Sequence, residues 1–182
     1  MSRDKMLGYV HVPRTGGWSV ACLLHRMCPQ SQTIKYLGHI PNSADTQRQH
    51  VTVSCVRHPY ERFISMYKHR LAHYDNDSKW KIQHYIDQVS VHGWKGYQNY
   101  WFEHKPSDIL LRHTHLQADW SKLVDMFDLD VDPQLPHEHN TSHVEYIEPT
   151  ADQQQTISRV VESDVKYYEQ VLLKECTCIH QM

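Results

Sequence analysis

The stretch MLGYVHVPRTGGWSVACLLHRM, residues 6–27, decides the fold class. Its first part, 6–12, is apolar and rich in β-prone residues, which predicts a strand that ends at Pro13. A turn with two adjacent glycines follows. From residue 20 to residue 27 the apolar side chains recur at i, i+3, i+4 and i+7, the spacing of one helix face. The stretch therefore predicts a strand, a glycine turn and a helix in succession.

The same alternation continues along the chain. Strands are predicted at 33–37, 51–56 and 108–112, and helices at 60–74, 82–89, 120–127 and, in one or two pieces, 150–174. Thr150 followed by Gln153 has the pattern of a capping box at the start of the last helical region. Because strands alternate with helices, we expect an α/β fold with a mainly parallel central sheet flanked by helices.

Length and charge limit the possible functions. The 182 residues favour a single domain, 1–182, and the net charge of −2 lacks the strong basic excess of nucleic-acid-binding proteins. No apolar run approaches the roughly 20 residues that cross a bilayer, and no signal-peptide pattern opens the chain. The five cysteines, an odd number, favour free thiols. We therefore expect a soluble, cytoplasmic protein that binds neither nucleic acid nor membrane.

The glycine turn has the features of an anion-binding loop. Its glycines allow close approach of backbone N–H groups to a phosphate, and a helix follows directly. Thr15 and Ser19 supply hydroxyl donors, and Arg14 supplies a fixed positive charge. A tight turn without a ligand is the alternative. The pattern G-x-x-x-x-G-K-[ST] is missing from the chain, which disfavours an ordinary ATPase or GTPase.

A second group of polar residues follows the strand at 51–56. Arg57 stands just past this strand, and Ser65 lies about two helical turns further on. An arginine at a strand end and a serine on the next helix can bind one phosphate from two sides. The alternative is a solvated helix with a surface pair between Arg62 and Glu61.

Taken together, HVPRTGGWS at 11–19 and VRHPYERFISMY at 56–67 resemble the sulfotransferase family. The chain is most similar to the carbohydrate sulfotransferases, including the heparan-sulfate 2-O type. The resemblance implies a P-loop-like three-layer fold that binds 3′-phosphoadenosine 5′-phosphosulfate (PAPS) without a metal. It also implies which residues bind this donor. The 5′-phosphosulfate would be held by Arg14, Thr15, Gly16, Gly17, Trp18 and Ser19, and the 3′-phosphate by Arg57 and Ser65.

The chain departs from the family pattern at three places. Arg14 stands where lysine is usual, and His58 where aspartate is more common. Residues 112–116, RHTHL, replace a segment of the type Arg-Phe-Glu-Asn-Leu. The last departure leaves the role of this segment open, although it does not affect the expected donor.

Two residues are predicted to be catalytic. Arg14 is expected to stabilise charge on the leaving 5′-phosphate, because of its place in the loop. The sequence YLGH at 36–39 resembles the segment that carries the catalytic histidine of the 2-O type enzymes, which makes His39 the expected general base. Glu61 and Asp45 are the reserve candidates.

The remaining chemistry-bearing residues leave several alternatives open. The chain holds 16 histidines, and metal ligands are conceivable at 113–115, at 137–139 with His143, and at 176–180, but no metal is expected. The aromatic run 97–102 fits either a sugar-binding cleft or a core. We expect the acceptor to be a hydroxylated molecule, a glycan or another small compound. A non-catalytic phosphonucleotide-binding module, a histidine-rich metal-binding protein and a nucleotide kinase are the competing hypotheses.

Overall fold

The computed structural model describes residues 6–39, 49–74, 81–92, 107–136, 147–172 and 177–178. These residues form a five-stranded sheet in the order β2-β1-β3-β4-β5, in which every neighbouring pair is parallel. The strands are β1 (Leu7–Val10), β2 (Ile34–Gly38), β3 (Val51–Val56), β4 (Ile109–Arg112) and the two-residue β5 (Thr177–Cys178). The predicted α/β class with a mainly parallel sheet is confirmed.

The central strand β3 is buried almost throughout, although its polar and apolar residues alternate. Thr52 and Ser54 are both inaccessible to solvent. The carboxylate of Asp108 accepts hydrogen bonds from the backbone N–H of Thr52 at 2.8 Å and from its hydroxyl at 2.9 Å. The hydroxyls of Ser54 and Ser107 lie 2.6 Å apart. Because the side chains of Thr52 and Ser54 both have hydrogen-bond partners, burying this strand between helices costs little free energy of folding.

Helical residues pack against both faces of the sheet, as a three-layer fold requires. On one face, α1 (Trp18–Cys22), its π-helical continuation η1 (Leu23–Met27) and α6 (Leu116–Phe127) pack against β1, β3 and β4 in the main apolar core. On the other face, Val56 and Leu110 contact tyrosines from α8 (Glu162–Tyr167) and η4 (Tyr168–Leu172). The P-loop-like three-layer arrangement is thereby confirmed.

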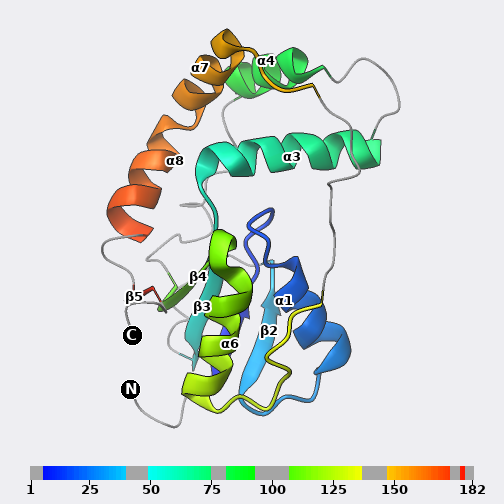
Figure 1. Ribbon diagram of the computed structural model, residues 1–182, viewed down its shortest axis with the longest axis vertical. Helices are drawn as coiled ribbons and strands as arrows, with labels where there is room; N and C mark the ends of the chain where they lie inside the picture. Colours follow the sequence, from blue (N-terminus) through cyan, green and yellow to red (C-terminus); the bar gives the residue numbers. More distant parts are fainter. Residues whose placement is uncertain are drawn as a thin grey trace.

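A helical layer with its own core lies beyond the carboxyl ends of the strands. It consists of α3 (Pro59–Tyr74), α4 (Ile82–His92) and α7 (Ala151–Val160), and Figure 1 shows α3 crossing above the sheet. Phe63, Tyr85 and Ile157 are the centre of this second core. Because β3 runs directly into α3, the first turns of α3 meet the loop that follows β1. This junction contains the site described below.

The main differences between the predicted and observed element boundaries lie in three helical regions. The helix expected at 20–27 starts at Trp18 and changes to π-helical hydrogen bonding at Leu23. The helix expected at 120–127 starts four residues earlier, at Leu116. The C-terminal helical region divides into α7, α8 and η4, and the predicted capping box between Thr150 and Gln153 is present. Among the described residues, none of the helices combines the length and apolar character needed to span a bilayer.

Candidate functional site

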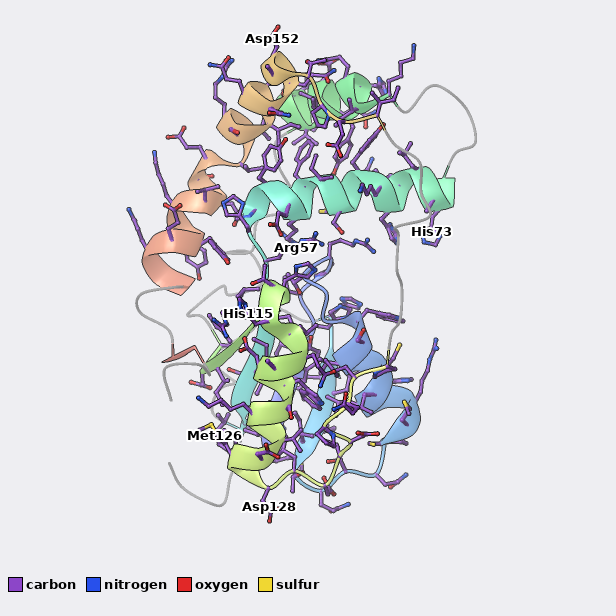
Figure 2. All side chains as sticks on the ribbon, viewed as in Figure 1. Arg57, His73, His115, Met126, Asp128 and Asp152 are labelled. Atoms are coloured by element: carbon purple, nitrogen blue, oxygen red, sulfur yellow. The ribbon has the colours of Figure 1, made fainter. Side chains whose placement is uncertain are left out.

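A cavity of about 1040 Å³ opens at the carboxyl edge of the sheet, between the loop after β1, the end of β2, α3 and the segment after β4. In Figure 2, Arg57 lies below the start of α3 and His115 at the adjoining end of α6. None of the residues found to line the cavity carries a carboxylate. The lining residues are His11, Pro13, Arg14, Gly16, Trp18, Ser19, His39, Arg57, Ser65, His69, residues 113–118, Leu135 and Pro136.

The loop after β1 is held in a strained backbone conformation. Arg14 has a φ of 64° and Gly16 a φ of 85°. Glycine adopts such an angle freely, whereas for a residue with a side chain this backbone conformation is about 1–2 kcal/mol less favourable. Thr15 is buried, and its hydroxyl donates to the backbone carbonyl of Val12 at 2.8 Å. Thr15 therefore stabilises the turn. The prediction that its hydroxyl points at a bound anion is not met, because this hydroxyl donates to Val12 instead.

Gly17 is required by the packing beneath the loop. The buried hydroxyl of Tyr9 lies 3.1 Å from the carbonyl oxygen of Gly17 and 3.1 Å from the sulfur of Cys55. A Cβ atom at Gly17 would lie 2.0 Å from the same hydroxyl oxygen. Gly17 therefore supports the loop from below, while its neighbours Trp18 and Ser19 line the cavity.

The two predicted phosphate-binding segments contact each other directly. The Nε and Nη2 atoms of Arg14 donate to the hydroxyl oxygen of Ser65 at 3.3 and 3.1 Å. Burial, and secondly the charge of Arg57, lower the pKa of Arg14 from its ordinary value. Two guanidinium groups and a serine hydroxyl are thus gathered at one cavity, where an anion would relieve the repulsion between the two positive charges.

Arg57 and Glu61 form an ion pair one turn apart, with the Arg57 Nε atom 3.4 Å from Glu61 Oε2. The alternative prediction, a solvated Arg62 paired with Glu61, is wrong. Only 1% of Arg62 is exposed, and its Nε donates to the carbonyl oxygen of Pro13 at 2.8 Å. Burial lowers the pKa of Arg62 to about 10, and the negative charge of buried Asp164, on α8, opposes this shift. Arg62 is therefore a second link between the two segments.

His39 lies at the mouth of the cavity, after Gly38, whose φ is 86°. The His39 Nδ1 atom is 3.2 Å from the carbonyl oxygen of His11, so in the tautomer with a proton on Nδ1 it donates to this carbonyl. The centroids of the two imidazole rings are 4.2 Å apart. His11 is buried, and mainly for that reason its pKa falls to about 3, with His39 and Arg14 contributing. His11 lines the cavity, although no role was predicted for it within the motif at 11–19.

Arg112, at the end of β4, joins the strand to α6. Its side chain makes a bidentate pair with Asp119, with Nε to Oδ2 at 2.9 Å and Nη2 to Oδ1 at 2.6 Å. The backbone N–H of Arg112 also donates to Asp119 at 2.8 Å. This clamp fixes the start of the segment 113–118, which lines the cavity, and gives the divergent segment RHTHL a structural role.

A model of the sulfotransferase family matches residues 2–106, more than half of the chain. The chain belongs to the sulfotransferase family. The matched region contains the loop at 14–19, His39 and the segment from Arg57 to Ser65. The cavity wall at 113–118 and the residues Leu135 and Pro136 lie outside it. A search of curated proteins returned no match.

The family supports sulfuryl transfer as the class of reaction. Within the described part of the chain, no three His, Cys, Asp or Glu residues are grouped so that they could hold a metal ion. Several sequence hypotheses lie outside the described residues: the aromatic run 97–102, the reserve base Asp45, the histidines at 137–143 and the side chains at 176–180.

Proposed function

We propose that this sulfotransferase, as one domain over residues 1–182, transfers a sulfuryl group from PAPS to a hydroxyl of a carbohydrate or another small acceptor. The observation that best supports the proposal is the contact between Arg14 and Ser65 at the cavity. It brings together the two segments to which the family resemblance assigns the two ends of the donor.

The residues at the cavity fit a polyanionic nucleotide. Two arginines, serine hydroxyls and backbone N–H groups are donors that bind phosphate, and none of the described residues that line the cavity carries a carboxylate. In this proposal Arg14, Gly16, Trp18 and Ser19 contact the 5′-phosphosulfate, and Thr15 and Gly17 keep the loop in shape. Arg57 and Ser65 contact the 3′-phosphate. The donor supplies the activated sulfuryl group and a nucleotide leaving group.

In this proposal Arg14 stabilises the negative charge that develops on the leaving 5′-phosphate. Its guanidinium is partly buried, so a charge beside it is less screened than in water. We expect Arg14→Ala to lower turnover by about 10²–10³-fold, because one donor to the developing charge is lost. Thermal unfolding should change little, because the partly buried Arg14 side chain loses only its hydrogen bonds to Ser65 among those seen in the described residues. Initial rates with PAPS and a melting curve check the prediction.

Two further variants sharpen the Arg14 prediction. Arg14→Lys, which keeps the charge but loses the planar fork, should retain part of the activity. Arg26→Ala, which removes an exposed arginine from η1, is the matched control and should behave like the wild type. Near-normal turnover in Arg14→Ala would contradict the assigned role.

His39 is the proposed general base. A proton on Nδ1, donated to the carbonyl of His11, leaves the Nε2 lone pair to accept the proton of an acceptor hydroxyl. The side chain is exposed at the cavity mouth, where an acceptor can reach it. His11 is a poorer base, because its lowered pKa leaves it with little affinity for a proton. In this proposal the acceptor approaches His39 from its exposed side.

The nucleotide requirement tests the proposal. Metal-stripped protein is titrated in a calorimeter with 3′-phosphoadenosine 5′-phosphate, and adenosine 5′-phosphate is the control ligand. We expect tight binding that depends on the 3′-phosphate, followed by transfer from PAPS in a screen of hydroxylated acceptors. Binding without transfer to any acceptor would favour the non-catalytic module. The absence of binding, or equal binding of both nucleotides, would overturn the donor assignment.

A further inference from the structure

His113, the first residue of the short helix η3 (His113–His115), lies directly on the glycine loop. A Cβ atom at Gly16 would be 2.5 Å from the Cδ2 atom of His113 and 3.3 Å from its Nε2 atom. The side chain is 30% exposed and lines the cavity. The imidazole therefore forms part of the surface that a phosphate bound in the loop would contact, although it lies outside the region matched by the family model.

The two ring nitrogens of His113 face different surroundings. Nδ1 is buried without a hydrogen-bond partner among the described residues, and the Glu61 Oε2 atom lies 3.9 Å away, beyond hydrogen-bonding distance. Nε2 lies on the side of Gly16. The ring is thus placed between a carboxylate on α3 and the loop proposed to bind the 5′-phosphosulfate. A protonated ring in this position could donate to both.

The charges around His113 explain why the ring is neutral when no anion is bound. Burial and the positive charge of Arg57 lower its pKa to about 4, and Glu61 opposes the shift. Arg14 adds a second positive charge at the same cavity. The other titratable groups that line the cavity are His11, His39, His69 and His115. A bound phosphate would offset the two arginines and favour the imidazolium.

We propose that His113 is a further ligand of the donor's 5′-phosphate group and that it takes up one proton from solvent when the nucleotide binds. The imidazolium would then link the bound phosphate, through Nε2, to the carboxylate of Glu61, through Nδ1. The inference rests on the proposed function, because it assumes that a phosphonucleotide occupies the loop. It adds a residue and a protonation step that the two family motifs do not contain.

The sign of the pH dependence follows from linkage. Binding raises the pKa of His113 from its low starting value, so the nucleotide complex holds more protons than the free protein. Affinity is therefore greatest at low pH and falls as the pH rises through the pKa of the bound state. Binding by the wild type should therefore strengthen from pH 8 to pH 6 by more than binding by a variant that lacks the imidazole.

The experiment measures proton uptake directly. The protein is titrated with 3′-phosphoadenosine 5′-phosphate at pH 6 and pH 8, each in two buffers of different ionisation enthalpy. The nucleotide's own phosphates titrate near pH 6, so the informative quantity is the difference between wild type and variant. His113→Phe keeps a flat ring on Gly16 but cannot be protonated, and His113→Gln keeps an uncharged donor. His92→Phe, at the exposed end of α4, is the matched control.

We expect the wild type and the His92→Phe variant to take up about half a proton or more beyond the His113→Phe variant at pH 6. His113→Gln should lose this uptake while keeping most of the affinity at pH 8. Equal uptake and equal pH dependence in wild type and His113→Phe, with normal melting curves, would overturn the inference and leave the proposed function standing. If the wild type does not bind the nucleotide, the proposed function and this inference fail together.

Discussion

His39→Ala is expected to slow sulfuryl transfer by about 10²–10⁴-fold, the usual contribution of a positioned general base. The substitution removes the group proposed to take the proton from the acceptor hydroxyl. It leaves the proposed nucleotide ligands Arg14, Arg57 and Ser65 in place. Binding of 3′-phosphoadenosine 5′-phosphate and the melting temperature should therefore remain close to those of the wild type, because His39 is exposed.

The measurement is turnover with saturating PAPS and acceptor from pH 5 to pH 9. Turnover of His39→Ala should lie below that of the wild type throughout this range, because the group that accepts the hydroxyl proton is missing. His84→Ala, which removes an exposed histidine from α4, is the control for general effects of losing an imidazole. Full turnover of His39→Ala across this pH range would reject the assignment and return attention to Glu61 and Asp45.

Arg62→Met is expected to destabilise the fold by about 3–5 kcal/mol, because the buried charge of Asp164 loses the buried positive charge that offsets it. Arg62 and Asp164 are 1% and 0% exposed, and the charge of Asp164 raises the pKa of Arg62 against the effect of burial. The variant also loses the hydrogen bond to the carbonyl of Pro13, the residue before the strained Arg14.

Urea unfolding of the single and double variants checks this prediction. Arg62→Met combined with Asp164→Leu removes both charges, and its stability should recover much of the loss because no unpaired charge remains. Nucleotide binding should recover less, since the Pro13 carbonyl still lacks its donor. Arg70→Met, on the same helix α3, is the control for losing an arginine beside Tyr85. A single variant as stable as the wild type would show that the buried pair contributes nothing.

Local signals explain what could be predicted from the sequence. The strands carry runs of apolar β-prone residues, and the glycine turn and the segment after β3 each lie within one strand–helix junction. In a parallel sheet these junctions meet at one edge, so the meeting of Arg14 and Ser65 follows from the fold class. Both motifs, and the edge of the sheet at which they meet, could therefore be predicted from the sequence.

The residues that were missed act through contacts between distant segments. From the sequence alone, Arg62 has the pattern of a solvated helix residue. In the structure it is buried, it donates to the carbonyl of Pro13, and the charge of Asp164 on α8 acts on it. From the sequence, His113 was considered only as a possible metal ligand and as part of the divergent segment 112–116. Its contact with Gly16 depends on the pair between Arg112 and Asp119. His11 lies directly after β1 and lines the cavity. No local pattern encodes such placements.

The predicted helix boundaries differ from the observed ones for a similar reason, because they too depend on contacts between distant segments. The start of α6 at Leu116 depends on η3 and on the Arg112–Asp119 pair, which shift the first turn ahead of the apolar stripe. The short α1 has no side-chain hydrogen bond at its N-terminal cap, Gly17. The packing of Gly17 on Tyr9 sets the position of this helix, and the sequence around Gly17 contains no capping pattern that would predict it.

The central claim is that Arg57 contacts the 3′-phosphate of a nucleotide whose 5′ end lies in the glycine loop. The most direct test is a four-way comparison of binding free energies by calorimetry. Wild type and Arg57→Ala are each titrated with 3′-phosphoadenosine 5′-phosphate and with adenosine 5′-phosphate, and the exposed Arg159→Ala is the control. We expect the wild-type preference for the 3′-phosphate to shrink by about 1.5–3 kcal/mol in Arg57→Ala, the worth of a charged hydrogen bond. Equal weakening of both nucleotides, or no weakening of either, would contradict the claim.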